Sequence, residues 1–125
     1  MTRILIIEDD ADLRSLMVEG LQAAGYEVMA APDGNRGLEL QRERPADLVI
    51  TDIFMPQKEG IETIGELKQE FPGVKIIAMS GGGTYLKNSG YLYTASELGA
   101  TLVLRKPFGQ QALLDSVRQV LQPSS

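Results

Sequence analysis

Five short apolar segments recur along the chain and predict five β-strands. Four of them are continuous, which is typical of strands that are covered on both faces in a parallel sheet. The segment at 26–30 partly alternates with polar positions and predicts an edge strand. The five segments are Ile4–Ile7, Tyr26–Ala30, Leu48–Ile50, Ile76–Met79 and Leu102–Leu104.

Amphipathic helical patterns lie between these segments. Apolar residues recur three and four positions apart over 13–24, 61–71 and 113–121, which predicts three helices with one apolar face each. The apolar stripe of the first helix comprises Leu13, Leu16, Met17, Gly20, Leu21 and Ala24.

Two weaker patterns predict further helices over 34–44 and about 86–98. Asp33 stands where the first of these would need an N-cap. Strand and helix then alternate five times, which predicts an α/β fold with helices on both faces of a parallel sheet.

Polar residues follow four of the predicted strands. Right-handed crossovers place the carboxyl ends of parallel strands on one edge, where ligands bind in such sheets. The residues that reach this edge are Glu8-Asp9-Asp10, Asp52, Ser80 and Lys106-Pro107. Each signal alone has an ordinary structural explanation as a helix cap, a turn or a loop. Their coincidence at four strand ends favours a functional site.

The chemistry of this cluster points to phosphoryl transfer. Carboxylates that lie about 4–6 Å apart repel one another unless a proton or a cation intervenes. Oxygen ligands favour a hard cation such as Mg²⁺, which also binds phosphate oxygens. A carboxylate can then attack a phosphoryl group, and positioning and charge stabilisation do most of the remaining work. The pattern predicts Asp52 as the phosphate acceptor, with Lys106 and Ser80 contacting the phosphoryl oxygens.

Composition narrows the possible functions. The chain has 125 residues, which suits a single domain over 1–125 that is ordered over about 2–122. It contains no Cys and no His, which excludes thiol chemistry, Ser-His-Asp catalysis and a phosphohistidine of its own. A net charge of −5 without a basic patch argues against direct nucleic-acid contact. No apolar run is long enough to span a membrane, and MTRILIIEDD lacks the features of a signal peptide, so we expect a cytoplasmic protein.

Several short segments together resemble the receiver domain of two-component response regulators. They are IIEDD at 6–10, TDIFMP at 51–56 with Gly60 after it, MSG at 79–81, LGA at 98–100 and RKPF at 105–108. The resemblance covers about residues 3–121. It implies a flavodoxin-like, doubly wound sheet of five parallel strands in the order 2-1-3-4-5, with five helices.

The resemblance also implies a function. Such a domain is a signalling switch rather than an enzyme, and it promotes only its own aspartyl phosphorylation and dephosphorylation. The phosphoryl group would come from a phosphohistidine on a sensor histidine kinase or a His phosphotransfer protein. Phosphorylation would then change the face formed by the fourth helix, the fifth strand and the fifth helix, which meets a downstream effector protein or output domain.

The metal site implied by the resemblance is made of acidic residues. Glu8 and Asp9 match the pair that holds Mg²⁺ (or Mn²⁺), with Asp9 as the more direct ligand. Asp10 matches a third, less essential acid. Asp52 matches the phosphoacceptor, which is also a metal ligand, and the backbone carbonyl of Phe54 matches a further ligand.

The phosphate-binding part of the site is implied in the same way. Ser80 matches the hydroxyl that moves toward the phosphoryl group on activation, and the small Gly81 leaves space for that group. Lys106 matches the Lys that contacts it. The Lys106–Pro107 bond is similar to one that is usually cis in the family.

The sequence departs from the family pattern after the fourth strand. The family usually has an aromatic residue three positions before the Lys, and here that switch position is Val103. Tyr85, Tyr91 or Tyr93 could replace the aromatic switch, or these tyrosines could simply pack. The segment SGGGTYLKNSGYLYTASELGA is also longer than the family norm, which leaves the choice of partner open.

Three other functions remain possible from the residues. A haloacid-dehalogenase-type enzyme would also use an Asp at a strand end, but it needs a second Asp at the position of Phe54. A flavodoxin-like electron carrier needs a hydroxyl-rich phosphate loop, where this chain has Glu8-Asp9-Asp10. A receiver that only mediates protein contacts, without phosphorylation, is kept open by Val103.

Phe54 generates the first testable prediction. A side chain two positions after the phosphoacceptor overhangs the site in the family, so we expect the Phe54 ring to shield an acyl phosphate from water. Replacing Phe54 with Asn or Lys should therefore speed the decay of phosphorylated protein, measured by intact mass against time. An unchanged decay rate would refute the shielding role.

Overall fold

A five-stranded parallel sheet forms the centre of the computed structural model, which describes residues 1–53, 60–80 and 99–122. The strand order is β2-β1-β3-β4-β5, and each neighbouring pair is parallel. The strands are β1 (Arg3–Ile7), β2 (Glu27–Ala31), β3 (Leu48–Asp52), β4 (Lys75–Ser80) and β5 (Leu102–Arg105). The predicted fold class and strand order are confirmed, including the position of β2 at an edge of the sheet.

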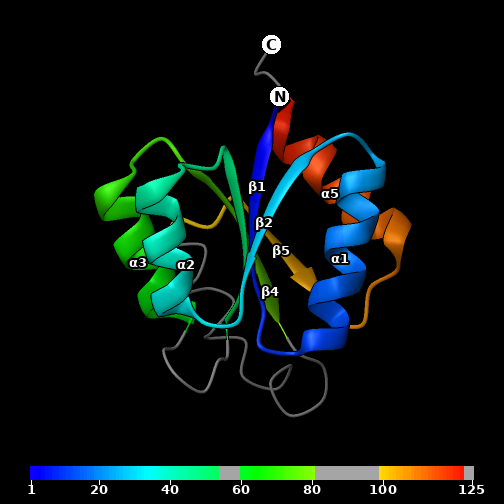
Figure 1. Ribbon diagram of the computed structural model, residues 1–125, viewed down its shortest axis with the longest axis horizontal. Helices are drawn as coiled ribbons and strands as arrows, with labels where there is room; N and C mark the ends of the chain where they lie inside the picture. The colour runs from blue at the N-terminus through cyan, green and yellow to red at the C-terminus, as the bar shows by residue number, and fades with distance from the viewer. Residues whose placement is uncertain (54–59, 81–98, 123–125) are drawn as a thin grey trace.

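Four helices of the described residues cover the two faces of the sheet (Figure 1). One face carries α1 (Ala11–Ala23) and α5 (Gln110–Leu121), and the other carries α2 (Gly34–Glu43) and α3 (Gly60–Glu70). The helix predicted over about 86–98 lies outside the described residues. Among the helices that the structure does describe, none has the length and apolar character that a bilayer crossing requires.

Two layers of apolar side chains separate the sheet from its helices. Alternate residues of β1 enter opposite layers, with Ile4 and Ile6 packed on the α1–α5 side and Leu5 and Ile7 packed on the α2–α3 side. All four are fully buried. Complete burial of such a side chain stabilises the fold by about 1.5–3 kcal/mol, which explains why the strand is a continuous apolar run.

Helix α1 departs from its predicted apolar face at Leu16. This residue belongs to the sequence stripe, yet it is 61% exposed, whereas Met17 and Leu21 are buried. The stripe is wider than the line along which α1 meets the sheet, so Leu16 falls on the outer side of that line. The apolar stripe of the sequence therefore includes a residue that lies outside the core.

A capping side chain and a glycine set two of the helix ends. The Asp33 side chain accepts a hydrogen bond of 2.9 Å from the Arg36 backbone N–H at the start of α2, so the predicted cap is confirmed. Gly25 follows α1 with a φ of 98°, a conformation that favours glycine. The chain can therefore reverse into β2 without backbone strain.

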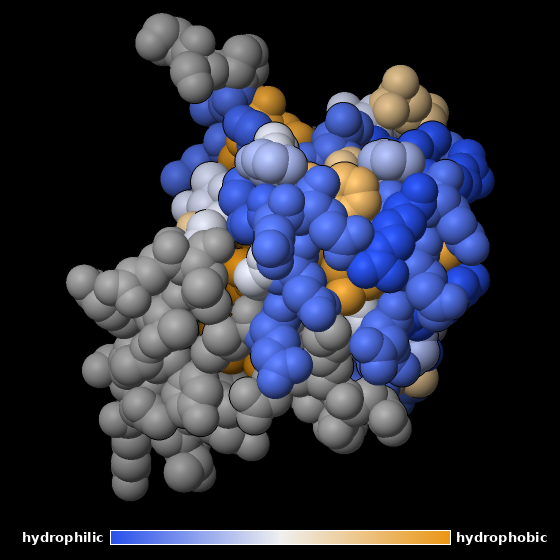
Figure 2. Space-filling model, turned by 90° about the vertical axis from the view of Figure 1, so that its left-hand side faces the viewer, coloured by the Kyte–Doolittle hydropathy of each residue, from blue (hydrophilic) through white to orange (hydrophobic). Residues whose placement is uncertain are grey.

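The outer surface of α2 and α3 is mainly hydrophilic. Figure 2 shows this side of the molecule, where polar residues dominate the described part of the surface. Arg42 of α2 donates two hydrogen bonds, of 2.8 and 2.7 Å, to the carboxylate of Glu70 of α3. This bidentate contact joins the ends of the two helices at the surface.

The carboxyl ends of the strands all lie at the lower edge of the sheet in Figure 1. Gly60, the first residue of α3, packs directly against the end of β3. A Cβ atom added at Gly60 would lie 1.9 Å from the Asp52 carbonyl oxygen and 2.5 Å from the Ile53 Cα. A side chain at position 60 would therefore push against backbone that carries Asp52.

This close approach makes a prediction for Gly60→Ala. Because the obstructing atoms are backbone, we expect the substitution to lower the free energy of unfolding by about 1–3 kcal/mol. Gly65→Ala is the matched control in the same helix, since nothing lies within 4 Å of its added Cβ. Alanine there should stabilise the helix by about 0.5–1 kcal/mol. Urea unfolding followed by circular dichroism measures both, and equal effects would contradict the prediction.

Candidate functional site

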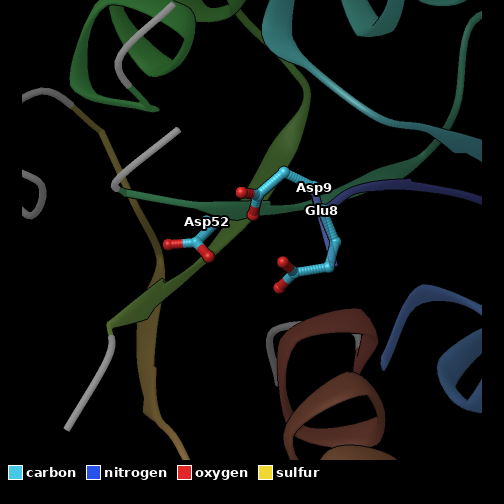
Figure 3. Close-up of side chains that lie close together, drawn as sticks. All are labelled: Glu8, Asp9 and Asp52. Atoms are coloured by element: carbon cyan, nitrogen blue, oxygen red, sulfur yellow. The ribbon is translucent and has the colours of Figure 1, made fainter. Parts of the chain in front are cut away.

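Three carboxyl groups meet at the carboxyl edge of the sheet. Glu8 and Asp9 follow β1, and Asp52 ends the neighbouring strand β3. One oxygen from each side chain lies within 4.8 Å of the other two. Figure 3 shows the three groups around a common space. The convergence predicted from the strand ends is therefore present in the structure.

The three acids differ in exposure. Glu8 is fully buried, Asp52 is 5% exposed and Asp9 is exposed. A buried carboxylate requires a cation or hydrogen bonds to compensate for lost solvation. The cluster is thus open to solvent at Asp9 and closed at Glu8.

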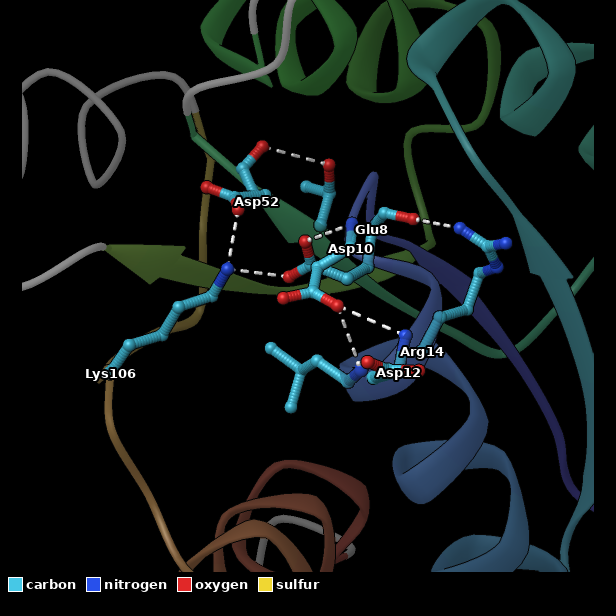
Figure 4. A network of polar contacts seen from close by, with 8 residues as sticks. Glu8, Asp10, Asp12, Arg14, Asp52 and Lys106 are labelled. Atoms are coloured by element: carbon cyan, nitrogen blue, oxygen red, sulfur yellow. Dashed lines mark hydrogen bonds and ion pairs between the residues drawn. The ribbon is translucent and has the colours of Figure 1, made fainter.

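Lys106 supplies the compensating charge. Its ammonium, just beyond β5, donates a hydrogen bond of 2.5 Å to Glu8 Oε1 and another of 2.6 Å to Asp52 Oδ2 (Figure 4). Residues 98 positions apart in the sequence are thereby joined. The Lys106–Pro107 peptide bond is cis, which is the isomer that the resemblance implies.

The protonation of this network reflects burial and pairing. Burial raises the pKa of the Glu8 carboxyl above its ordinary value, although the hydrogen bond from Lys106 opposes the shift. Burial alone would lower the pKa of the Lys106 ammonium. The hydrogen bonds to Asp52 and Glu8 together outweigh this effect, so the pKa of Lys106 lies above its ordinary value.

The segment after β1 is held by hydrogen bonds in addition to Lys106. The Asp10 backbone N–H donates to Glu8 Oε2 at 3.0 Å. The Asp10 side chain in turn accepts from the backbone N–H groups of Asp12 and Leu13, at 3.0 and 3.2 Å, and so caps α1. Asp10, the third acid of the sequence pattern, therefore points into the helix start and has a structural role in this network.

Ser80 ends β4 beside the same network. Its carbonyl accepts a hydrogen bond of 2.8 Å from the Lys106 backbone N–H, which places the two residues side by side. The Ser80 hydroxyl is buried, and among the described residues it has no hydrogen-bond partner. A buried hydroxyl without a hydrogen bond costs about 1–3 kcal/mol, and its presence in a native structure often has a functional reason.

The remaining predicted positions have mixed outcomes. Val103 lies in β5 and packs, partly buried, against the α2–α3 core. Phe54, Gly81 and the three tyrosines of the 81–98 segment lie outside the described residues. The sequence reasoning missed the contact between Lys106 and Glu8, and it also missed a hydrogen bond of 2.7 Å from Arg14 Nη1 to the Glu8 carbonyl. No periodicity or motif signals a contact of this kind.

The donor set fits a hard divalent cation. Three carboxylate oxygens from two adjacent strands face one space, and one of the acids is accessible to solvent. The set contains no nitrogen or sulfur ligand, which favours Mg²⁺ or Mn²⁺ over softer metals. The neighbouring ammonium and the Ser80 hydroxyl, which has no partner among the described residues, are suited to phosphoryl oxygens, so the arrangement combines a cation site with an anion site.

Comparison with known proteins gives a consistent result. A family model described as the response regulator receiver domain matches residues 4–118. The response regulator receiver protein CpdR of Brucella abortus is 33% identical over 121 residues, which is 97% of this chain and 98% of that protein. The transcriptional regulatory protein CpxR of Klebsiella pneumoniae is 36% identical over 124 residues, which is 99% of this chain. The chain spans 51% of the length of CpxR.

Solved structures also resemble this fold. The chemotaxis protein CheY4 of Vibrio cholerae has a TM-score of 0.87 and 28% sequence identity, with 97% of this chain and 99% of that chain covered. NtrX of Brucella abortus, solved in complex with ADP, has a TM-score of 0.88 and 27% identity. The match covers 97% of this chain and 27% of NtrX.

The double contact of Lys106 generates a prediction for Lys106→Met in metal-free buffer. Without the ammonium, two buried carboxylates lose a partner, and we expect the free energy of unfolding at pH 7 to fall by about 2–3 kcal/mol. The pKa of Glu8 should also rise further. A carboxyl whose pKa is higher in the folded than in the unfolded state destabilises the fold only where it is ionised. The deficit should therefore shrink as the pH falls toward 4.5, the ordinary pKa of the group.

Urea unfolding at several pH values measures this deficit. Glu8→Gln combined with Lys106→Met is the matched variant, because it removes one of the two charges that lose the ammonium and should recover part of the loss at pH 7. A deficit that stays constant from pH 7 to pH 5 would contradict the electrostatic origin.

Proposed function

This chain belongs to the response regulator receiver domain family, and from that premise we propose that Asp52 accepts a phosphoryl group from a phosphohistidine of a partner protein. Receiver domains are signalling switches rather than enzymes with released products. The observation that carries the proposal is the meeting of Asp52 with Lys106, Glu8 and Asp9 at one edge of the sheet. We propose that residues 1–125 act as one receiver domain.

The transfer step is a displacement at phosphorus. A carboxylate oxygen of Asp52 forms the new O–P bond, while the P–N bond to the donor imidazole breaks and its electron pair stays with the ring nitrogen. The released imidazole then takes up a proton from solvent. The strand end fixes the position of the attacking oxygen, and positioning is a large part of what this reaction requires.

Lys106 and Ser80 contribute charge and hydrogen bonding to the transferred group. Lys106 contacts Asp52, which supports the proposal that its ammonium would neutralise a phosphoryl oxygen on that carboxylate. The buried Ser80 hydroxyl lacks a partner among the described residues and would gain one by donating to a second phosphoryl oxygen. Such preorganised donors stabilise charge that develops during the reaction.

Glu8, Asp9 and Asp52 are the described residues that would hold Mg²⁺ or Mn²⁺. Bound there, the cation would neutralise phosphoryl oxygens and relieve the repulsion between the acids. Asp9 is the exposed member of the set, so a cation would enter the site from solvent on the side of Asp9. We propose the backbone carbonyl of Phe54 as a further ligand and the small Gly81 as space for the phosphoryl group, on the basis of the family pattern alone.

The switch that follows phosphorylation would use an atypical set of residues. The position that is usually aromatic in the family is Val103, which is packed in β5 and is too short to rotate as a ring does. A tyrosine at 85, 91 or 93 remains our proposal for the moving group. Autocatalytic phosphorylation from small donors and autocatalytic dephosphorylation are also part of this proposal.

The partners are proposed by class. The donor is a sensor histidine kinase or a His phosphotransfer protein, in keeping with the absence of His from this chain. The receiver of the signal is an effector protein or an output domain. The relatives differ in length in a way that fits either receiver of the signal. CpdR matches this chain over nearly its whole length, whereas CpxR is about twice as long. With a net charge of −5, this chain itself is not expected to bind nucleic acid.

Acetyl phosphate with Mg²⁺ tests the proposal directly. We expect intact mass spectrometry to show the addition of one phosphoryl group, because acetyl phosphate supplies an activated phosphoryl donor without a protein partner. Asp52→Asn should abolish the addition, and chelation of Mg²⁺ by EDTA should prevent it. Asp115→Asn is a matched control, since Asp115 is an acid in α5 outside the cluster.

Two results would contradict the proposal. One is phosphorylation that persists in Asp52→Asn, which would place the acceptor elsewhere. The other is steady release of phosphate from p-nitrophenyl phosphate, which would favour a phosphatase of the haloacid-dehalogenase type.

A further inference from the structure

Arg14 reaches back from α1 to the end of β1. Its guanidinium Nη1 donates a partly buried hydrogen bond of 2.7 Å to the backbone carbonyl of Glu8 (Figure 4). Within the part of the chain that the structure describes, no ion pair joins Arg14 to a carboxylate. The Arg14 side chain therefore contacts the backbone of a residue in the acidic cluster, and it has no part in the phosphoryl transfer proposed above.

Glu8 is bonded at every polar group. Its N–H donates to the Ala31 carbonyl at 3.0 Å, and its carboxylate accepts from the Asp10 N–H and from Lys106. Its carbonyl accepts from Arg14. The bond to Ala31 continues the pairing of β1 with β2, and the bond from Asp10 lies within the segment between β1 and α1. The bond from Arg14 ties the segment to the body of α1.

The carbonyl of Glu8 controls the direction in which Asp9 leaves the strand. A peptide unit is planar, so the Glu8 carbonyl, the Asp9 N–H and the Asp9 Cα lie in one plane. Fixing the carbonyl therefore fixes the plane from which the Asp9 side chain projects. Asp9 is exposed, so its backbone has a large part in setting the direction of its side chain.

Resting on the metal-binding role proposed for Asp9, we infer that Arg14 is a positioning residue of the cation site. It orients the Glu8–Asp9 peptide so that the Asp9 carboxylate stays within reach of Glu8 and Asp52. Arg14 acts through the carbonyl and leaves the ligand oxygens free. Residues that orient metal ligands from outside the ligand set commonly affect metal affinity by about 10–100-fold.

Charge and positioning predict opposite effects at this residue. If Arg14 mattered only as a positive charge near the site, removing it would weaken repulsion of the cation and strengthen Mg²⁺ binding. If it positions Asp9, removing it weakens Mg²⁺ binding. The sign of the change therefore separates the two explanations without any measurement of phosphorylation.

The experiment compares three variants of the full chain. Arg14→Met removes the donor and the charge while keeping much of the aliphatic volume, and Arg14→Lys keeps a cationic donor. Arg36→Met is the matched control, because Arg36 is an exposed residue near the start of α2 whose side chain lies 3.9 Å from Glu39. Each protein is titrated with Mg²⁺, and thermal unfolding is followed by circular dichroism from its own EDTA baseline. The rise in melting temperature with Mg²⁺ gives an apparent Kd.

We expect Arg14→Met to raise the Kd for Mg²⁺ about tenfold. Arg14→Lys should recover most of that loss, and Arg36→Met should bind as tightly as the natural protein or slightly more tightly. Equal or tighter binding by Arg14→Met would overturn the inference, and so would a lysine variant as weak as the methionine variant. Absence of Mg²⁺ binding by the natural protein would instead overturn the proposed metal site itself.

Discussion

Like charges gathered at one edge of the sheet are the constraint on which the rest of the structure depends. Glu8 and Asp52 are almost fully removed from water, and Asp9 stands beside them. The cost of burying a carboxylate is several kcal/mol after relaxation, and excellent geometry is needed to offset it. Lys106 provides that geometry with one ammonium shared between two acids. Burial nevertheless leaves the pKa of Glu8 raised, so the compensation is incomplete.

The sheet supplies the rigidity that such a cluster requires. β1 lies between β2 and β3, so the strand that carries Glu8 is paired on both sides and packed on both faces. The point where the chain order changes direction is beside β1, and ligands bind there in doubly wound folds. Gly60 then allows α3 to start against the backbone of Asp52. Apolar packing and a close backbone approach thus fix the acids from behind, and only Asp9 is exposed to solvent.

The parts that could be predicted from sequence are those with a local or periodic signal. Continuous apolar runs indicated buried strands, Asp33 indicated a helix start, and polar residues after the runs indicated the shared edge. Leu16 shows the limit of periodicity, because a stripe identifies the apolar side of a helix but not the width of its contact with the sheet. The contacts of Lys106 and Arg14 with Glu8 could not be predicted, since each depends on the path that a long side chain takes in the folded protein.

The hydrogen bonds within the site distinguish a residue that is fixed in place, Glu8, from one that would move on phosphorylation, Ser80. Glu8 is bonded at its N–H, its carbonyl and both carboxylate oxygens, so any displacement of it breaks several bonds at once. The Ser80 hydroxyl is equally buried, yet within the described residues it makes none. A buried hydroxyl without a partner is a standing cost of about 1–3 kcal/mol, which an acceptor oxygen arriving on Asp52 would remove. Under the proposed function, that relief is free energy available to draw the end of β4 toward the phosphoryl group, while the fully bonded Glu8 keeps the cation site unchanged.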